Sequence, residues 1–393
     1  MPGKTILVIS HDATRTGAPI LLLRFLRGIK EDRPNTTFDF ILGGGGPLLG
    51  EFESLGRTLV IHQPSNVSTP LSFRTRLGNK IKRITGNVTK RPRLEDRISA
   101  FVDKEYDLVL SNTITNGHIL RALGSVHCNI VTFVHELENS IKMFTQPDAL
   151  KYNLQHSDFF LVPSHAVQRN LISNHHLSKN KLYLQPYYIP AIDVNTDLIS
   201  DMKQQLGGVD CKLIGAIGTS DWRKGIDLFI QAALQFRINH PEANVKFLWV
   251  GAAIEDSSYD RLMYDITHAG LSDYVLLVGS VDNPLLYLAC MDVFLMISRE
   301  DPYPLVVLEA AMLKKPVICF DSAGGASEFL ADGVGLVVPY LDVVAMVGEL
   351  SKLLDSGSER ERYGKNAWEK YLKLHSKESA LKTFAKHLKK FQK

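Results

Sequence analysis

Two carboxylates frame an apolar run in the stretch SREDPYPLVVLEAA, residues 298–311. Asp301 follows the short apolar segment DVFLMI, and Glu309 lies inside LVVLEAAML, a predicted helix that is apolar on several sides. A buried carboxylate without hydrogen-bond donors is costly. Asp301 could cap the following helix. Glu309 needs donors of another kind, and the diol of a ribose would supply them.

Two cations and two small residues indicate where a phosphate could bind. Arg223 and Lys224 lie in GTSDWRKG, residues 218–225, directly before a predicted helix over 225–239. Cations beside the positive end of a helix dipole suit a diphosphate, although a solvated loop pair is the alternative. Gly17 and Ala18 follow the first predicted strand and would let the backbone approach a ligand closely.

Several familiar signatures are absent from the sequence. No Gly-x-Gly-x-x-Gly follows the first strand, because GGGG at 43–46 is followed by Pro and Leu residues. The sequence has no Walker lysine motif, no Asp-x-Asp pair for a divalent metal and no His/Cys cluster with ligand spacing. These absences argue against a nicotinamide or flavin site and a P-loop. We therefore expect no cofactor and no metal.

Short, continuously apolar runs alternate with helical patterns along the chain. Such runs are typical of parallel strands buried on both faces, and the alternation predicts βαβ units in an α/β fold. Two series of runs predict two doubly wound domains, with a boundary near 188–200. The predicted strands are 5–10, 38–42, 58–62, 107–111, 129–135, 159–164 and 181–186, then 212–218, 245–251, 275–279, 292–298, 316–320 and 335–339. Ligands of such sheets bind beyond the carboxyl ends of the strands.

Composition sets the remaining limits. The 393 residues have a net charge of +3, too small to imply nucleic-acid binding, and four scattered cysteines that predict no disulfide framework. No run approaches the roughly 18 apolar residues of a membrane span, so we expect a cytoplasmic protein, with peripheral contact at the cytoplasmic face of the membrane left open. Residues 74–97 are basic and form either a solvated loop or an arm for a membrane or acceptor. The basic, amphipathic tail 359–393 is expected to pack on the protein's own surface rather than on a membrane.

The chain resembles the family-four retaining glycosyltransferases (glycosyl transferases group 1). DPYPLVVLEA resembles their E-x7-E motif, and RKGIDLFIQAA their lysine-glycine phosphate loop. SHDATRTGAP resembles their amino-terminal glycine loop, VTFVHE the segment with their active-site histidine, and SDFFLVPSHAVQRNL their inter-domain stretch. VLLVGSVDNPLLYLACMDVFLMIS and SAGGASEFL complete the series in family order. The resemblance covers nearly the whole chain and implies a GT-B fold, two Rossmann-like domains that face each other across a cleft. The expected parts are an acceptor-side domain over 1–190, a donor domain over 191–370 and a basic helix over 371–393 that packs back toward the first domain.

The resemblance also implies a role for each matching position. Glu309 would bind the ribose hydroxyls, Arg223 and Lys224 the diphosphate, and Asp301 and His135 would lie beside the sugar as the catalytic pair. The other expected donor-binding residues are Gly17 and Ala18 at the diphosphate, Val281 at the base, and Thr219, Tyr303, Leu305 and Val306.

Three positions depart from the family pattern. Asp301 is one methylene shorter than the family's glutamate, which alters its reach to a sugar hydroxyl. Thr219 stands where the family often has an arginine, which leaves the phosphate charge to Arg223 and Lys224. Pro302 and Pro304 replace glycines, and because proline has no N–H, backbone donors to the sugar must come from Tyr303, Leu305 or Val306.

The function implied is metal-independent, retaining transfer of a hexose or deoxyhexose from a nucleotide-sugar to a glycan or lipid-linked acceptor in surface polysaccharide biosynthesis. Two alternatives stay open, a nucleotide-sugar epimerase of the same architecture and a catalytically weak nucleotide- or glycan-binding subunit. The sequence does not identify the sugar, the base, the acceptor, the linkage or the oligomeric state.

Overall fold

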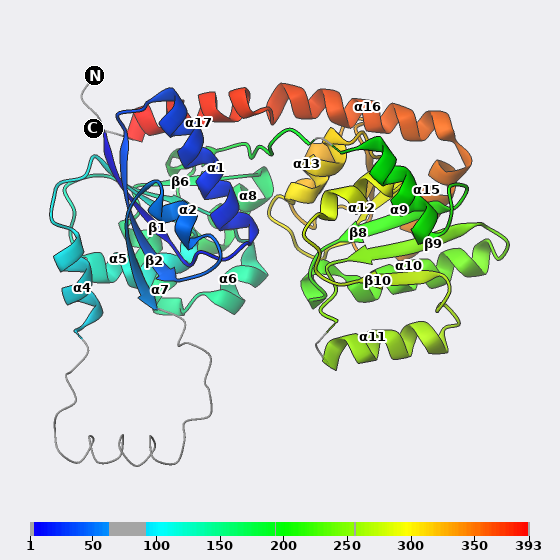
Figure 1. The fold of residues 1–393 in the computed structure, drawn as a ribbon. Coiled ribbons are helices and arrows are strands. Elements are labelled where there is room, and N and C mark those ends of the chain that lie inside the picture. Colours follow the sequence, from blue (N-terminus) through cyan, green and yellow to red (C-terminus); the bar gives the residue numbers. More distant parts are fainter. Residues whose placement is uncertain (1–3, 63–91, 193, 255–256, 392–393) are drawn as a thin grey trace, which may run out of the picture.

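The computed structural model describes residues 4–62, 92–192, 194–254 and 257–391. The basic segment over 74–97 lies mostly outside these residues, and only its last positions are described, at the start of α4 (Leu94–Phe101). The described chain forms two α/β halves that lie side by side, with a pair of helices running across both (Figure 1). None of the described helices is long and apolar enough to cross a membrane.

The first half is built on a parallel sheet that has seven strands within the described residues. The strands lie in the order β3-β2-β1-β4-β5-β6-β7. Their continuously apolar sequences are buried on both faces, as at Leu7, Val8 and Ile9, which have no measurable exposure. The strands are β1 (Thr5–Ser10), β2 (Thr37–Gly44), β3 (Gly56–His62), β4 (Leu108–Asn112), β5 (Ile130–Phe133), β6 (Phe159–Val162) and β7 (Leu182–Leu184).

Helices cover both faces of this sheet. The helix α1 (Gly17–Asp32) shows why it packs there, because Leu22, Phe25, Leu26 and Ile29 recur at helical spacing and are all buried. The other helices of this half are α2 (Leu49–Glu53), α4, α5 (Gly117–Leu123), α6 (Glu138–Phe144), α7 (Pro147–His156) and α8 (His165–His175), together with the 3-10 turns η1 (Ile114–Asn116) and η2 (Lys179–Lys181).

The second half repeats this plan around a parallel sheet of six described strands in the order β10-β9-β8-β11-β12-β13. The strands are β8 (Lys212–Ile217), β9 (Val245–Val250), β10 (Val275–Val278), β11 (Val293–Met296), β12 (Val317–Phe320) and β13 (Leu336–Val338). The helices are α9 (Thr196–Leu206), α10 (Ile226–Asn239), α11 (Ser257–His268), α12 (Pro284–Cys290), α13 (Leu305–Met312), α14 (Gly325–Leu330) and α15 (Val343–Asp355), with the 3-10 turn η3 (Trp222–Lys224).

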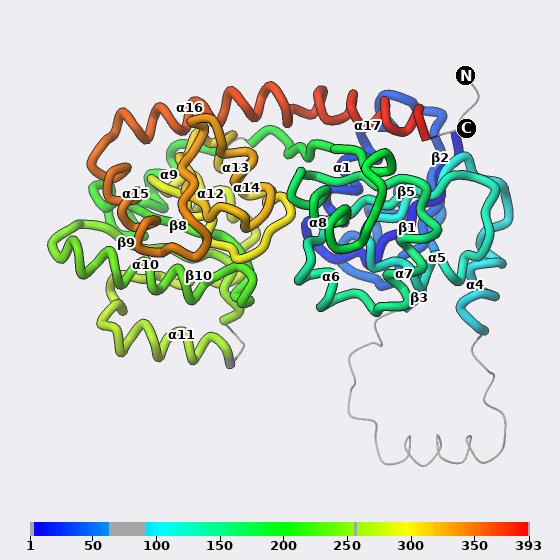
Figure 2. Tube along the Cα trace, turned by 180° about the vertical axis from the view of Figure 1, so that it is seen from behind, coloured from blue at the N-terminus to red at the C-terminus, as the bar shows by residue number. Residues whose placement is uncertain are grey.

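The last two helices return to the first half. The helices α16 (Gly357–Leu374) and α17 (Lys377–Phe391) run from the second half to the first, and α17 lies beside α1 in both views (Figures 1 and 2). The Phe384 ring lies 4.7 Å from the Phe25 ring, and Asn129 Nδ2 donates to the Phe391 carbonyl over 2.7 Å. The apolar face of α17 is therefore buried against the protein itself.

The fold explains how distant loops meet. In each sheet the strand order reverses beside its first strand, at β1/β4 and at β8/β11, which is where α/β sheets bind ligands. All thirteen strands predicted from the sequence are present, each within two residues of its expected ends. The predicted class, two Rossmann-like sheets with helices that cross back, is confirmed. The exact domain boundaries near 190 and 370 stay a prediction.

Candidate functional site

A cavity of about 590 Å³ lies between the two halves at the carboxyl ends of their strands. This volume is typical of a small-molecule site. Of the twelve site residues predicted from the sequence, ten line the cavity, namely Gly17, Ala18, His135, Arg223, Lys224, Asp301, Tyr303, Leu305, Val306 and Glu309. Segments as far apart along the chain as Gly17 and Glu309 therefore meet at one cavity, as expected for the carboxyl ends of parallel strands.

An ion pair joins the predicted phosphate loop to the first acid. Lys224 Nζ lies 2.7 Å from Asp301 Oδ2, and Arg223 NH1 lies 3.8 Å from the same oxygen. Both partners are mostly buried, with the Lys224 and Asp301 side chains 19% and 10% exposed. Lys224 is placed by η3, where the Asp221 carboxylate accepts from the Arg223 and Lys224 N–H groups. A diphosphate that binds Lys224 must compete with Asp301.

The backbone fixes Asp301 in place. Its N–H donates to the Ala323 carbonyl over 2.8 Å, and its carbonyl accepts from the Gly325 N–H over 3.2 Å. Gly324 has a φ of +139°, and a Cβ there would collide with the Asp301 carbonyl. The segment SAGGASEFL therefore needs glycine at 324 so that its backbone can lie against the acidic loop.

The helix α13 presents its amino terminus and one carboxylate to the cavity. The first N–H groups of a helix have no partner inside the helix, so those of Leu305 and Val306 are available donors. Glu309 lies one turn further along the same helix. Burial raises the pKa of Glu309, while the nearby Arg24 opposes that rise. Among the described residues its carboxylate has no hydrogen-bond or ion-pair partner, as expected for a side chain that waits for a ligand.

His135 has both ring nitrogens engaged by the protein. Nε2 lies 2.8 Å from Asn112 Oδ1, and Nδ1 lies 2.5 Å from the Tyr187 hydroxyl. Because Asn112 Nδ2 donates to the Ala18 carbonyl, Asn112 Oδ1 is an acceptor, so His135 donates from Nε2 and accepts at Nδ1. Burial lowers the pKa of His135 to about 3. The ring is thus neutral and oriented, and no nitrogen is free for a sugar in this structure.

Tyr303 is also held by the protein. Its hydroxyl donates to His375 Nε2 over 2.8 Å, because His375 Nδ1 donates to the Tyr187 carbonyl over 2.7 Å. Burial lowers the pKa of His375 to about 4, which keeps the ring neutral. The Tyr303 ring is also stacked on the His375 ring at 5.3 Å, so neither its hydroxyl nor that face is left for a ligand.

Two predicted residues lie outside the cavity lining. Thr219 is exposed, and its hydroxyl donates to Asp221 in the same loop over 2.5 Å. Val281 packs at the edge of the core rather than against the cavity. Their assigned places at the phosphate and the base stay predictions.

The structure adds four titratable residues that sequence reasoning missed, namely His11, Arg15, Glu136 and Tyr187. Glu136 lines the cavity, and burial raises the pKa of its carboxyl to about 7, against hydrogen bonds from the His135 and Ile114 backbone and from Thr113. His11 also lines the cavity, and its Nδ1 atom is buried without a hydrogen-bond partner. Glu136 follows His135 directly, and His11 follows the first strand, so position in the chain was the available signal.

Metal-ligating side chains do not gather in the described part of the chain. No group of three or more His, Cys, Asp or Glu residues there could hold a metal ion. The cations that face the cavity are Arg15, Arg223 and Lys224.

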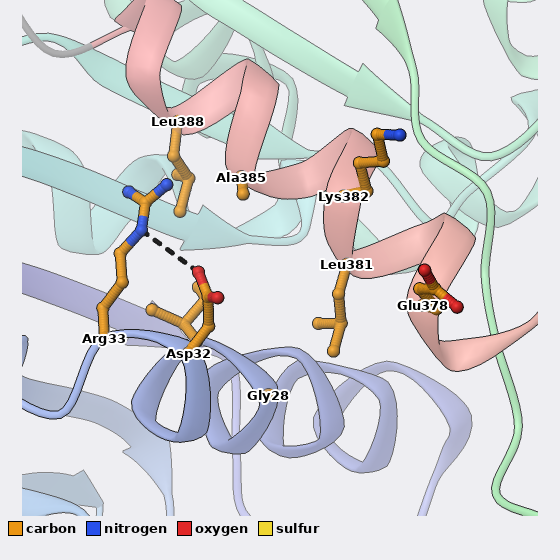
Figure 3. Close-up of a pocket in the computed structure, with 9 residues that line it drawn as sticks. Gly28, Asp32, Arg33, Glu378, Leu381, Lys382, Ala385 and Leu388 are labelled. Atoms are coloured by element: carbon orange, nitrogen blue, oxygen red, sulfur yellow. Dashed lines mark ion pairs between the residues drawn. The ribbon is translucent and has the colours of Figure 1, made fainter.

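A second cavity, of about 520 Å³, lies between α1 and α17 (Figure 3). Apolar side chains line its floor, and charged residues lie at its rim, where Arg33 pairs with Asp32 over 3.3 Å. None of the predicted site residues lines it, so it is separate from the site at the strand ends.

The sequence matches a known family over residues 200–370, described as "Glycosyl transferases group 1". Among curated relatives, the lipopolysaccharide core biosynthesis mannosyltransferase LpcC of Rhizobium leguminosarum bv. viciae is 28% identical over 156 residues, which cover 39% of this chain and 44% of that protein. The capsular polysaccharide biosynthesis glycosyltransferase CapM of Staphylococcus aureus is 28% identical over 155 residues, which cover 39% and 40%. The matched regions span less than half the length of each relative.

Solved structures resemble the whole fold. Anabaena Alr3699/HepE, crystallised with UDP-glucose, superimposes with a TM-score of 0.79 at 18% identity and covers 98% of this chain and 99% of that one. Sucrose-phosphate synthase from Thermosynechococcus elongatus gives 0.73 at 20% identity, with 98% of both chains covered. At these identities the likeness concerns the fold.

Proposed function

We propose that this chain, whose residues 200–370 match the glycosyl transferases group 1 family, is a retaining glycosyltransferase that uses a nucleotide-sugar. We propose that the donor binds in the 590 Å³ cavity, on the carboxyl ends of β8 and β11, and that the acceptor enters from the side of β1 and β5. The other half of the cleft supplies His11, Gly17 and Ala18.

One observation carries this proposal. The cavity is lined by the half-buried carboxylate of Glu309, which has no hydrogen-bond or ion-pair partner among the described residues, and by the cations Arg223 and Lys224. Glu309 lies on α13, whose amino terminus faces the same space. A nucleoside diphosphate needs these three features, because its ribose hydroxyls donate to a carboxylate and its phosphates accept from cations and helix N–H groups.

The proposed mechanism depends on stabilising the leaving group. The bond between the anomeric carbon and the phosphate oxygen breaks, and Lys224, Arg223 and the α13 amino terminus neutralise the diphosphate as it leaves. The acceptor hydroxyl forms its bond on the same face, and its proton passes to the leaving phosphate oxygen. Asp301 orients the donor sugar once Lys224 has moved to the phosphate. His135 is a positioning residue in this scheme, because both of its nitrogens are engaged.

We further propose a UDP-hexose donor and a surface-glycan acceptor. Support for the donor comes from the structural neighbour crystallised with UDP-glucose, and support for the acceptor comes from relatives named for lipopolysaccharide core and capsule biosynthesis. The proposed transfer needs no metal, since two side-chain cations and a helix terminus already face the diphosphate.

The test is a panel of UDP-, GDP- and dTDP-sugars with the purified full chain, followed by chromatography of the products. We expect release of the nucleoside diphosphate in the presence of EDTA, and a loss of donor binding of at least tenfold in Lys224→Ala, because a charge-assisted bond to phosphate is lost. Conversion of the donor sugar without any acceptor would favour the epimerase alternative. Failure of every donor to bind or react would refute the proposal.

A further inference from the structure

We propose that Glu300 is the latch that closes the cleft, a positioning residue that holds the acceptor-side half against the donor-side loop during transfer. Glu300 directly precedes Asp301 in the loop after β11, but its side chain leaves that loop and contacts α6 of the other half. Its Oε2 accepts from the Asn139 N–H over 2.9 Å, and its Oε1 accepts from the Ser140 N–H over 3.0 Å and from Ser140 Oγ over 2.8 Å.

These three bonds are strong for a contact between two halves of a chain. The carboxylate is ionic, so each bond is charge-assisted. The donors Asn139 N and Ser140 N lie in the first turn of α6, where backbone N–H groups have no partner inside the helix. Losing Glu300 would therefore leave unsatisfied donors on α6, as well as removing the contact between the halves.

The latch is tied to the cavity on both sides of the cleft. Ser140 lines the cavity from the acceptor side. On the donor side, the Glu300 carbonyl accepts from Arg223 NH1 over 2.9 Å, and Arg223 also lies 3.8 Å from Asp301. A ligand phosphate that draws Arg223 toward itself acts on the backbone of Glu300. Occupancy of the donor site and the position of α6 are thus coupled through one residue.

A second carboxylate bridges the halves elsewhere and serves as the matched control. Glu328 Oε2 accepts from the His165 N–H over 2.8 Å, and Glu328 pairs with Arg169 over 3.3 Å. Like Glu300, it contacts the first turn of a helix in the other half. Neither carboxylate lines the 590 Å³ cavity itself, but Glu300 contacts the cavity residues Ser140 and Arg223, whereas the partners of Glu328, His165 and Arg169, do not line it. If Glu300 were only a structural contact, replacing either carboxylate would have the same effect on sugar transfer.

The proposal separates into a structural part and a catalytic part. Closure of the cleft by Glu300 is a property of the protein without ligand. Its effect on transfer rests on the proposed function. The two are measured by different experiments, so failure of one is distinguishable from failure of the other.

The first experiment is small-angle X-ray scattering of the full chain without ligand, on the wild type, Glu300→Asp, Ser140→Ala and Glu328→Gln. Glu300→Asp keeps the charge but shortens the reach by a methylene. We expect its radius of gyration to rise, that of Ser140→Ala to rise less, and UDP to restore part of the compaction. Circular dichroism melts confirm that each variant is folded. A Glu300→Asp protein as compact as the wild type would overturn the proposal.

The second experiment measures transfer with the nucleotide-sugar that the panel identifies. In Glu300→Asp we expect kcat to fall about tenfold, with the donor KM changed less than about threefold, since the donor contacts themselves are intact. Glu300→Gln keeps one acceptor oxygen and should recover part of kcat. Glu328→Gln should keep kcat within about twofold. An equal loss of kcat in Glu328→Gln and Glu300→Asp would show a merely structural role.

Discussion

Asp301→Asn should tighten the binding of a nucleoside diphosphate, although it removes a carboxylate from the proposed active site. In the free protein Lys224 Nζ is held 2.7 Å from Asp301 Oδ2, so a diphosphate must displace this carboxylate before it can use the lysine. An asparagine amide has no charge and therefore competes less with the phosphate for Lys224. Most substitutions in a binding site weaken binding, so tighter binding in Asp301→Asn would identify the ion pair as its cause.

The magnitude follows from the geometry of the pair. A charge-assisted hydrogen bond of this kind contributes about 1.5–3 kcal/mol. Both partners keep some solvent contact, and Arg223 at 3.8 Å shares the carboxylate, so we discount the competition to about 1 kcal/mol. That corresponds to about a fivefold lower Kd for UDP. Sugar transfer should fall in the same variant, because the sugar loses its orienting carboxylate.

Isothermal titration calorimetry with UDP at pH 7.5 and 0.15 M salt measures this change. Asp273→Asn, at an exposed position of the same half, removes the same charge far from the ion pair and controls for the net charge. We expect UDP to bind more tightly to Asp301→Asn than to the wild type, and with unchanged affinity to Asp273→Asn. Weaker or unchanged UDP binding in that variant would refute the competition between Asp301 and phosphate for Lys224.

Three further predictions concern Glu136 and Tyr187 at the site and Gly364 in α16. In the folded chain, burial raises the pKa of the Glu136 carboxyl to about 7, so its contribution to stability is complete below pH 4.5 and is lost as the pH rises through 7. The free energy of unfolding of Glu136→Gln should therefore rise relative to that of the wild type between pH 5 and 8, by about 3 kcal/mol at most. Urea denaturation curves that give the same difference between the two proteins at every pH would contradict this. Tyr187→Phe removes the donor to His135 Nδ1 and should cost about 1–2 kcal/mol, with a changed ¹⁵N signal of that imidazole as the specific readout. Gly364→Ala should lower the melting temperature, because a Cβ there collides with the Lys314 carbonyl and pushes α16 away from α13. The expected cost is about 1–3 kcal/mol. An unchanged melting temperature would show that the two helices can separate freely.

The strands and their exits were predictable because one physical signal dominates them. Strands buried on both faces need continuous apolar runs, and the topology of parallel sheets brings the carboxyl ends of those runs to one edge. Arg223, Lys224 and Asp301 could therefore be placed near one another without any structure, although they come from different loops.

The hydrogen-bond partners could not be predicted, because they depend on tertiary contacts. The groups that engage the His135 nitrogens lie 23 and 52 residues away, at Asn112 and Tyr187. Glu300 and Asp301 are adjacent acids in a loop, and no periodicity decides which one faces the cavity and which one faces α6. The position of Thr219 in its motif predicts a place at the donor, whereas its hydroxyl donates to Asp221 in the same loop.

The return of α17 to the first half affects the order in which the protein can fold during synthesis. Phe384 covers the apolar face around Phe25, and Phe391 stacks on Phe159. Both side chains emerge from the ribosome some 200 residues after β7 has completed the first sheet. At about 5–20 residues per second, this face waits for about 10–40 s for its cover. The half that is synthesised first is thus completed last, and during that interval it presents an aromatic surface to which chaperones can bind.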